Sequence, residues 1–328
     1  MKNRLAIILV VLLLFCSSCS QSRTNEYIFA MDTYISLDIY GDDSVHKNIK
    51  NEITRLDNLF SVTNENSDVS KINSSSSTAV DDDTKNIISR ALELSSLTDG
   101  AFDISIYPVV SLWGFTKESH YIPNQNEVDD ALKKVGYKKI SLNGNSVSTD
   151  CEIDLGAIAK GFTCDKILDI LKRSQAKSAV ISMGGNVLLY GKKPNGENWR
   201  VGIQHPTKSD EIIGTLSTYD VSVVTSGSYQ RYFEQEGKRY HHIIDTKTGR
   251  PADSGILSVT IISNDATAAD ALSTALFVMG REKAEDFWHK QKNFEMIIVD
   301  ENYNVFITEG LKDCFVLKDL NYNLKVII

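Results

Sequence analysis

The spacing of apolar positions along the chain predicts helices at several places. Val45, Ile49, Ile53, Leu56 and Leu59 recur at intervals of three and four residues, which predicts a helix over residues 44–60. Caps and similar patterns predict further helices. These are expected over about 84–98, 124–137, 160–173, 265–280 and 281–291.

Alternating and β-branched stretches predict strands between these helices. Residues 25–41 favour one or two strands, and hairpins are expected around Glu236–Gly237 and over 295–310. Residues 66–83 are polar and are expected to form a surface loop. Further strand-like stretches are 146–156, 178–191 (interrupted by a glycine pair), 199–206 and 214–227. Because strands and helices do not alternate regularly, the pattern predicts an α+β fold with a mixed, largely antiparallel sheet and flanking helices. One compact domain is expected over residues 27–328.

The N-terminus has the pattern of an export signal. Basic Lys2 and Arg4 precede an apolar run over 5–15 that is too short to span a bilayer comfortably. The following "CSSC" resembles a lipoprotein signal, with Cys19 as the lipidated residue because two serines precede it. The expected organisation is a signal peptide over 1–18, a membrane tether over 19–26 and a location on the extracytoplasmic face of the cell membrane (the periplasmic side if there are two membranes). A plain cleaved signal or an uncleaved anchor is the alternative.

Charge and cysteine content narrow the class of protein. The net charge is −8, and no dense Lys/Arg run follows residue 20, which argues against nucleic-acid binding. With Cys19 lipidated, Cys151, Cys164 and Cys314 remain. They form no CxxC pair, so we expect buried thiols and no structural zinc site.

Several stretches carry polar residues or glycines that their apolar surroundings do not require. These are Asp103, the Asp154–Lys160 junction, the Gly184–Gly185 pair, the His241–Asp245 stretch, and Asp270 with Thr274 on one face of the apolar 265–280 helix. Each also has a purely structural explanation. The alternatives are a turn cap for Asp103, a solvated helix start for Lys160, a β-bulge for the glycines, a backbone hydrogen bond for His242 and a local hydrogen bond between Asp270 and Thr274.

Taken in order, seven stretches resemble one family. They are "MDT", "GAFDISIYPVVSLWGF", "DLGAIAKGFTCD", "MGGN", "TSGSYQRYF", "HIIDTKTGRP" and "ADALSTALFVMG". This series is similar to the ApbE-like FAD:protein FMN transferases over about residues 28–310. Two positions depart from the family pattern: Asp32 stands where Gly is usual, and Thr246 where Pro is usual.

The resemblance implies a T-fold-related domain and a Mg²⁺-dependent reaction. FMN would pass from FAD to a Thr or Ser hydroxyl of an acceptor flavoprotein, a subunit or domain of a membrane electron-transfer system, and AMP would leave. Two other functions stay open. One is a Mg²⁺-dependent FAD pyrophosphatase that gives FMN and AMP; the other is a non-enzymatic flavin-binding lipoprotein.

The resemblance also implies roles for individual residues. Mg²⁺ prefers oxygen ligands, and the implied ligands are Asp270, Thr274, Ser273 and the Ala157 carbonyl. The implied FAD pocket contains Met31, Ala101, Phe102, Asp103, Asp154, Lys160 and Ile244. A histidine of near-neutral pKa suits the removal of the hydroxyl proton, and His242 is the candidate. Asp245 would orient the site or share the role of base, and His241 is expected to point the other way.

Overall fold

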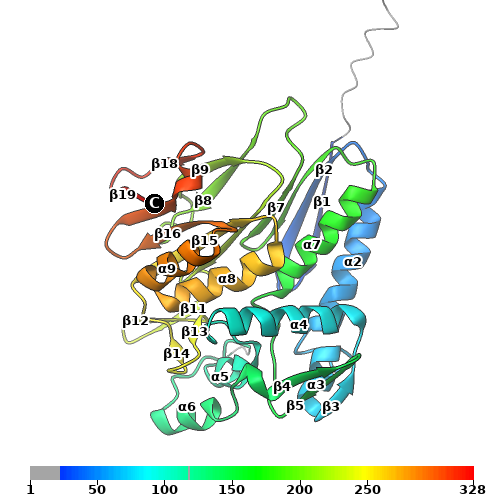
Figure 1. The fold of residues 1–328 in the computed structure, drawn as a ribbon, viewed down its shortest axis with the longest axis vertical. Coiled ribbons are helices and arrows are strands. Elements are labelled where there is room, and N and C mark those ends of the chain that lie inside the picture. Colours follow the sequence, from blue (N-terminus) through cyan, green and yellow to red (C-terminus); the bar gives the residue numbers. More distant parts are fainter. Residues whose placement is uncertain (1–22, 117–118) are drawn as a thin grey trace, which may run out of the picture.

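A nine-stranded sheet forms the centre of the protein (Figure 1). The computed structural model describes residues 23–116 and 119–328, so the expected signal peptide, Cys19 and most of the tether lie outside the described residues. Neighbouring strands are antiparallel except for the last pair, which is parallel. In spatial order the strands are β1 (Arg23–Ala30), β2 (Thr33–Tyr40), β6 (Ser178–Met183), β7 (Asn186–Tyr190), β10 (Ser222–Gly227), β15 (Ile256–Ser263), β16 (Glu295–Asp300), β17 (Asn304–Thr308) and β19 (Asn323–Ile327). The predicted α+β class with a largely antiparallel sheet is confirmed.

Helices cover one face of this sheet (Figure 1). They are α2 (Val45–Phe60), α7 (Ala159–Arg173), α8 (Ala266–Met279) and α9 (Arg281–Gln291), with α4 (Asp82–Leu97) beneath them. The predicted stripe of α2 is buried at Ile49, Ile53 and Leu56, which are completely shielded from solvent. Apolar burial of this kind is the main driving force for packing helices on a sheet.

A second sheet covers only part of the opposite face. Its strands are β18 (Phe315–Leu317), β9 (Ile212–Thr218) and β8 (Trp199–Gln204), in that order. Ile213, Leu216 and Phe315 pack against the half of the large sheet that contains Val223 and Ile297. The outer face of β1 and β2 lies outside this contact. Tyr27, Phe29 and Tyr34 remain 68%, 63% and 76% exposed there.

A smaller lobe lies below α4 (Figure 1). It contains α3 (Asp68–Ser74), α5 (Tyr107–Leu112), α6 (Gln125–Leu132) and the sheet β3 (Ser77–Ala79), β5 (Ser146–Thr149) and β4 (Ile140–Asn143). Three short 3-10 helices, Ile104–Ile106, Tyr137–Lys139 and Glu309–Leu311, complete the described helices.

The prediction of a surface loop over 66–83 was wrong, because that segment contains α3 and β3. Ser67 caps α3 by accepting a hydrogen bond from the Ser70 backbone, and Val69 and Ile72 are buried on one face. Because most of the surrounding residues are serines, the local pattern did not indicate a helix with these two apolar positions on one face. The strand expected over 146–156 ends earlier, at Thr149, whose hydroxyl accepts a hydrogen bond from the Cys151 backbone and starts a turn.

Two-residue turns with positive φ join three of the hairpins. Glu236–Gly237 joins β11 (Tyr232–Gln235) to β12 (Lys238–His241), as predicted. Met31–Asp32 joins β1 to β2, and Gly184–Gly185 joins β6 to β7. A Cβ on Gly184 would lie 2.5 Å from Thr33 Oγ1, so these last two turns lie side by side. The glycine pair is therefore a hairpin turn that packs closely against the β1–β2 hairpin, and the β-bulge explanation is excluded.

The expectation of buried thiols holds for two of the three cysteines. Cys151 and Cys164 are buried free thiols, whereas Cys314 is only half-buried. Among residues 23–116 and 119–328, no helix has the length and apolar character needed to cross a bilayer.

Candidate functional site

Asp270 is held at the place where α7 and α8 cross. Its Oδ2 atom accepts a hydrogen bond of 2.8 Å from the Gly161 backbone, and the side chain is 4% exposed. Gly161 lies in the first turn of α7, where unsatisfied N–H groups and the helix dipole favour a negative charge. A Cβ on Gly161 would lie 2.2 Å from the Ala266 carbonyl oxygen, so only glycine permits this approach. The carboxylate in the apolar helix thus has a backbone partner.

The hydroxyl groups of α8 meet the adjacent strand β10. Ser226 Oγ lies 2.7 Å from Ser273 Oγ and 3.2 Å from Thr274 Oγ1. Ser273 is fully buried and donates to the Asp270 carbonyl oxygen. In the described part of the chain the side chains of Asp270 and Thr274 share no hydrogen bond, so a local bond between them does not explain their spacing. Ser226 was missed from the sequence, although it lies in the "TSGSYQRYF" stretch.

Two oxygen atoms near α7 have no donor in the described ranges. One is Asp270 Oδ1, and the other is the Ala157 carbonyl, because the Gly161 N–H that would normally serve it donates to Asp270. Together with the Thr274 hydroxyl they fit the oxygen chemistry of Mg²⁺. Residues 23–116 and 119–328 contain no group of three or more His, Cys, Asp or Glu residues that could hold a metal ion. An ion here would therefore need further ligands from a substrate or from water.

The loop before α7 carries an acidic and a basic side chain. Asp154 Oδ1 accepts a hydrogen bond of 2.8 Å from the Gly156 backbone, and Lys160 Nζ donates to the Gly156 carbonyl at 3.3 Å. Burial raises the pKa of the Asp154 carboxyl, while the Gly156 N–H and the positive charges of Arg231 and Lys160 oppose the rise. The loop thus holds Asp154 and Lys160 close enough for the charge of Lys160 to act on the Asp154 carboxyl.

His242 is oriented by the backbone of Arg231. Its Nδ1 atom and its backbone N–H both donate to the Arg231 carbonyl oxygen, each at 3.1 Å. Because a carbonyl can only accept, the neutral imidazole carries its proton on Nδ1 and keeps a lone pair on Nε2. Burial, reinforced by the nearby charges of Arg231 and Lys160, lowers the pKa of His242 to about 3. The expectation of a near-neutral pKa was therefore wrong.

His241 has different surroundings, as predicted for neighbouring residues of an extended segment. It is buried, its Nε2 atom donates to the Ala252 carbonyl at 3.1 Å, and its ring contacts Phe277 of α8. His242 instead has its ring beside Phe115.

Other predicted residues build the walls of this region. Asp103 is buried and accepts hydrogen bonds from Ser105 and the Tyr137 backbone, so it caps a turn. Ala101 and Phe102, its neighbours, are buried. Both Asp103 oxygens are thus committed to the protein, in agreement with the alternative of a turn cap.

Contacts within the protein also hold the "HIID" stretch in place. Asp245 Oδ1 accepts from the Lys247 backbone at 2.8 Å, which closes the turn between β13 (Ile244–Asp245) and β14 (Arg250–Pro251). Ile244 packs with Val109 and Trp113. Thr246 donates to the Gly100 carbonyl at 2.6 Å and so ties this turn to the 100–103 loop.

Met31 borders the region from the β1–β2 turn. Its backbone N–H donates to Asp57 Oδ1 at 3.1 Å, and Thr163 Oγ1 on α7 lies 3.6 Å from its sulfur. The next residue, Asp32, forms an ion pair of 3.6 Å with Arg231. Sequence reasoning missed Arg231, because its role follows from contacts between distant segments.

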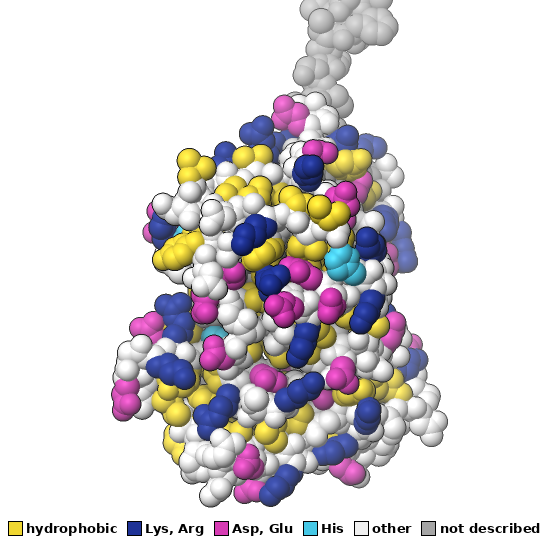
Figure 2. Space-filling view, turned by 60° about the vertical axis from the view of Figure 1, so that its left-hand side comes forward, with side chains coloured by type: hydrophobic (Ala, Val, Ile, Leu, Met, Phe, Trp, Pro, Cys, Tyr) yellow, Lys and Arg dark blue, Asp and Glu magenta, His cyan; other side chains and the backbone are white. Residues whose placement is uncertain are grey.

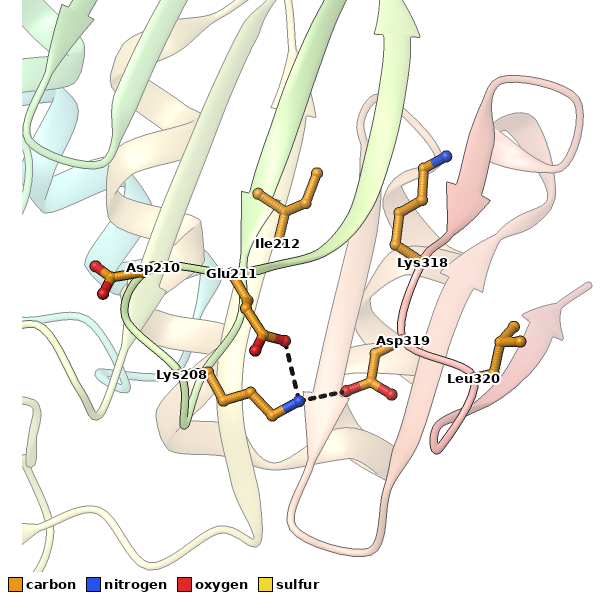
Figure 3. Close-up of a pocket in the computed structure, with 7 residues that line it drawn as sticks. All are labelled: Lys208, Asp210, Glu211, Ile212, Lys318, Asp319 and Leu320. Carbon is orange, nitrogen blue, oxygen red and sulfur yellow. Dashed lines mark hydrogen bonds and ion pairs between the residues drawn. The ribbon is translucent and has the colours of Figure 1, made fainter.

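Two surface depressions have linings that include none of the predicted site residues. One, of about 480 Å³, is lined by residues 208–212 and 318–320, and there Lys208 Nζ contacts Glu211 and Asp319 (Figure 3). The other, of about 460 Å³, includes Tyr107, whose pKa is raised by burial and by the nearby Asp154. On the face shown in Figure 2, basic and acidic side chains are intermingled.

Comparison with known proteins identifies the family. The model of the ApbE family matches residues 31–298. The chain belongs to the ApbE family. It is 32% identical over 316 residues to the FAD:protein FMN transferase of Klebsiella pneumoniae, covering 93% of this chain and 98% of that protein. For the FAD:protein FMN transferase of Vibrio cholerae the identity is 34% over 250 residues, with 72% and 75% covered.

Solved ApbE structures have the same fold. The ApbE protein of Thermotoga maritima superposes with a TM-score of 0.84 at 34% identity, covering 89% of this chain and 99% of that one. The flavin transferase ApbE of Vibrio cholerae gives 0.81 at 26% identity, with 90% and 99% covered.

Proposed function

We propose that this protein transfers FMN from FAD to a Ser or Thr hydroxyl of an acceptor flavoprotein. The observation that carries the proposal is the meeting of α7 and α8. Asp270 keeps one carboxylate oxygen and Ala157 its carbonyl without a donor from the described chain. These atoms lie in a protein whose relatives from Klebsiella pneumoniae and Vibrio cholerae are named FAD:protein FMN transferases.

The proposed reaction is a displacement at phosphorus. The acceptor oxygen forms a bond to the phosphorus on the FMN side of FAD, the pyrophosphate bond to AMP breaks, and AMP leaves with the bridging oxygen. The proton of the attacking hydroxyl passes to His242 Nε2, whose lone pair is preserved by the bond from Nδ1–H to the Arg231 carbonyl. A base within reach of the hydroxyl typically contributes 10²–10⁴-fold to such a rate.

The negative charge of bound FAD would change the pKa of His242. Burial and two nearby cations keep His242 neutral. A pyrophosphate beside it would offset those cations and raise its pKa, because an opposite charge favours the protonated form. His242 would then be neutral before transfer and able to hold a proton after it.

The residues assigned to magnesium are Asp270, Thr274 and the Ala157 carbonyl, with Ser273 holding the α8 backbone and the Ser226 hydroxyl in place. When bound, the ion supplies neutralisation of the pyrophosphate charge, as metals do in phosphoryl transfer. Asp154 and Lys160, from the loop before α7, would border the FAD, with Met31, Ile244 and the 101–103 loop as walls.

The activity is tested with purified protein, FAD and MgCl₂, with and without an acceptor domain. We expect flavin fluorescence on the acceptor band of a denaturing gel, release of AMP, and loss of both in EDTA. Rapid release of AMP that does not depend on acceptor would instead identify a pyrophosphatase. Binding of FAD without turnover would identify a flavin-binding protein.

We also propose that Cys19 is lipidated and that the protein acts at the extracytoplasmic face of the membrane, on an acceptor of a membrane electron-transfer system. The support is the N-terminal sequence, in which an apolar run and "CSSC" end four residues before β1 begins at Arg23. Mass spectrometry of the membrane fraction tests this. Cys19→Ser is expected to abolish the lipid mass and, with it, membrane retention.

A further inference from the structure

Asp32 and Arg231 form an ion pair at the edge of the candidate site. Arg231 Nη2 lies 3.6 Å from Asp32 Oδ2, and the two side chains are 54% and 84% exposed. Asp32 has a φ of 57°, in the left-handed region that an aspartate tolerates less well than glycine. A side chain is thus present at a position where the backbone would favour glycine.

The fold brings these residues together through two hairpin turns. Thr33, which follows Asp32, touches the Gly184–Gly185 turn. A Cβ on Gly185 would lie 3.0 Å from the side chain of Gln230, the residue before Arg231. The ion pair therefore spans segments that are about 200 residues apart in sequence but packed against a common turn.

Arg231 also adjoins the residues assigned to chemistry. Its carbonyl accepts both hydrogen bonds from His242, and its positive charge acts on His242 and on Asp154. Asp32 is the acidic neighbour that offsets this charge. A guanidinium beside the proposed base, more than half exposed, is suited to a phosphate oxygen, because its planar donors match phosphate geometry.

We propose that Arg231 binds the pyrophosphate of FAD and that Asp32 competes with FAD for the Arg231 guanidinium. FAD must then displace the Asp32 carboxylate to gain the guanidinium. This inference rests on the proposed function, since it concerns the same FAD site. Asp32 acts as an internal competitor that weakens FAD binding, and this effect depends on Arg231.

The test compares the FAD affinities of the wild type and five variants of the full chain. Affinity is measured from FAD fluorescence after rapid mixing, with MgCl₂ and without acceptor, at low and high salt. Asp32→Asn keeps a side chain that tolerates positive φ but removes the charge. We expect it to bind FAD about threefold to fivefold more tightly at low salt, the range that an exposed ion pair supports. Arg231→Gln is expected to bind about tenfold more weakly, as for a lost charge-assisted contact.

The double variant, Asp32→Asn with Arg231→Gln, shows whether Asp32 acts on FAD binding through Arg231. If Asp32 acts through Arg231, Asp32→Asn gives no gain in the Arg231→Gln background, and the salt dependence of FAD binding is flatter there. Arg231→Lys should restore part of the affinity, which a purely structural defect would not allow. The matched control is Glu234→Gln, which removes a similar charge from the exposed Glu234–Arg239 pair on the neighbouring hairpin and should leave affinity unchanged.

Two results would overturn the inference alone. One is normal FAD binding with no gain in Asp32→Asn, and the other is a gain that persists without Arg231. Absence of FAD binding by the wild type would instead overturn the proposed function together with it.

Discussion

The Gly161 backbone and the Asp270 carboxylate are joined by a hydrogen bond of 2.8 Å across two helices. The bond has two consequences. It orients a carboxylate that would otherwise be an unpaired charge in an apolar helix, and it withdraws the Gly161 N–H from the Ala157 carbonyl. One hydrogen bond thus orients the Asp270 carboxylate and leaves the Ala157 carbonyl without its usual donor, and both groups are proposed ligands of magnesium.

Removing the charge of Asp270 while keeping its shape should abolish activity without unfolding the protein. In Asp270→Asn the amide oxygen can still accept from Gly161, so the free energy of unfolding should change by no more than about 1 kcal/mol. Loss of the anionic ligand should reduce AMP release at least about 100-fold, the low end of the loss found when one group that stabilises a transition state is removed. Urea unfolding and an AMP assay over a range of Mg²⁺ concentrations check this. Wild-type turnover at the wild-type Mg²⁺ requirement would exclude Asp270 as a ligand.

Adding a methyl group at Gly161 should separate the helices. A Cβ there would lie 2.2 Å from the Ala266 carbonyl oxygen and 2.7 Å from Asp270 Cβ. Gly161→Ala is expected to destabilise the protein by about 1–3 kcal/mol, the cost of overpacking, and to reduce activity. Urea unfolding measures the first effect. Lys172→Ala, on the exposed last turn of α7, is the control and should have little effect on either quantity.

His242 should make folding stability depend on pH. Its pKa is about 3 in the folded protein, against about 6.5 for an ordinary histidine, chiefly because of burial. The unfolded chain therefore takes up the proton first, and the contribution to stability is lost as the pH falls from about 6.5 toward 3. Urea unfolding between pH 4.5 and 7 should show a smaller pH dependence in His242→Gln than in the wild type. An identical pH dependence would contradict the depressed pKa.

The same variant should be defective in transfer. His242→Gln keeps a polar side chain near the Arg231 carbonyl but lacks the basic nitrogen. We expect flavinylation to fall about 10²–10⁴-fold, the contribution usual for a general base. Gel fluorescence of the acceptor measures this, with His241→Gln as a neighbouring control. Near-normal transfer would remove His242 from the mechanism.

Thr246 should stabilise the loop beside the site. Its hydroxyl donates to the Gly100 carbonyl at 2.6 Å. Thr246→Val keeps the shape and loses this bond, so the free energy of unfolding should fall by about 1 kcal/mol and the KM for FAD should rise. Thermal unfolding and steady-state kinetics check the two effects. Thr248→Val, two residues along the same turn, gives a comparison without the Gly100 contact.

Local patterns were enough to predict much of the fold. The α2 stripe, the helix expected from residue 124 and the Glu236–Gly237 turn each depend on residues close in sequence, and all three are present. The Asn124 side chain caps α6 by accepting a hydrogen bond from the Glu127 backbone. The loop expected over 66–83 failed because Val69 and Ile72 are only two apolar positions among many serines. Packing against distant residues, which the local pattern does not contain, stabilises that helix.

The site was predictable only in part. Resemblance to a family pointed to Asp270, Thr274 and His242, but not to the contacts that orient them. Gly161, Ser226 and Arg231 reach the site from α7, β10 and a hairpin segment, so their roles depend on tertiary structure. The pKa of His242 was misjudged for the same reason, because its burial is a property of the folded chain.

The crossing of α7 and α8 has a further consequence. Asp165 of α7 accepts hydrogen bonds from the Ala266 and Thr267 backbones at the start of α8, while Asp270 of α8 accepts from Gly161 at the start of α7. Each helix closes the other's first turn. If either helix frays, buried N–H groups of its neighbour lose their acceptor, so the two should exchange their amide hydrogens as a single cooperative unit. The candidate magnesium ligands therefore lie on or next to two helices, each of which stays folded only while the other does.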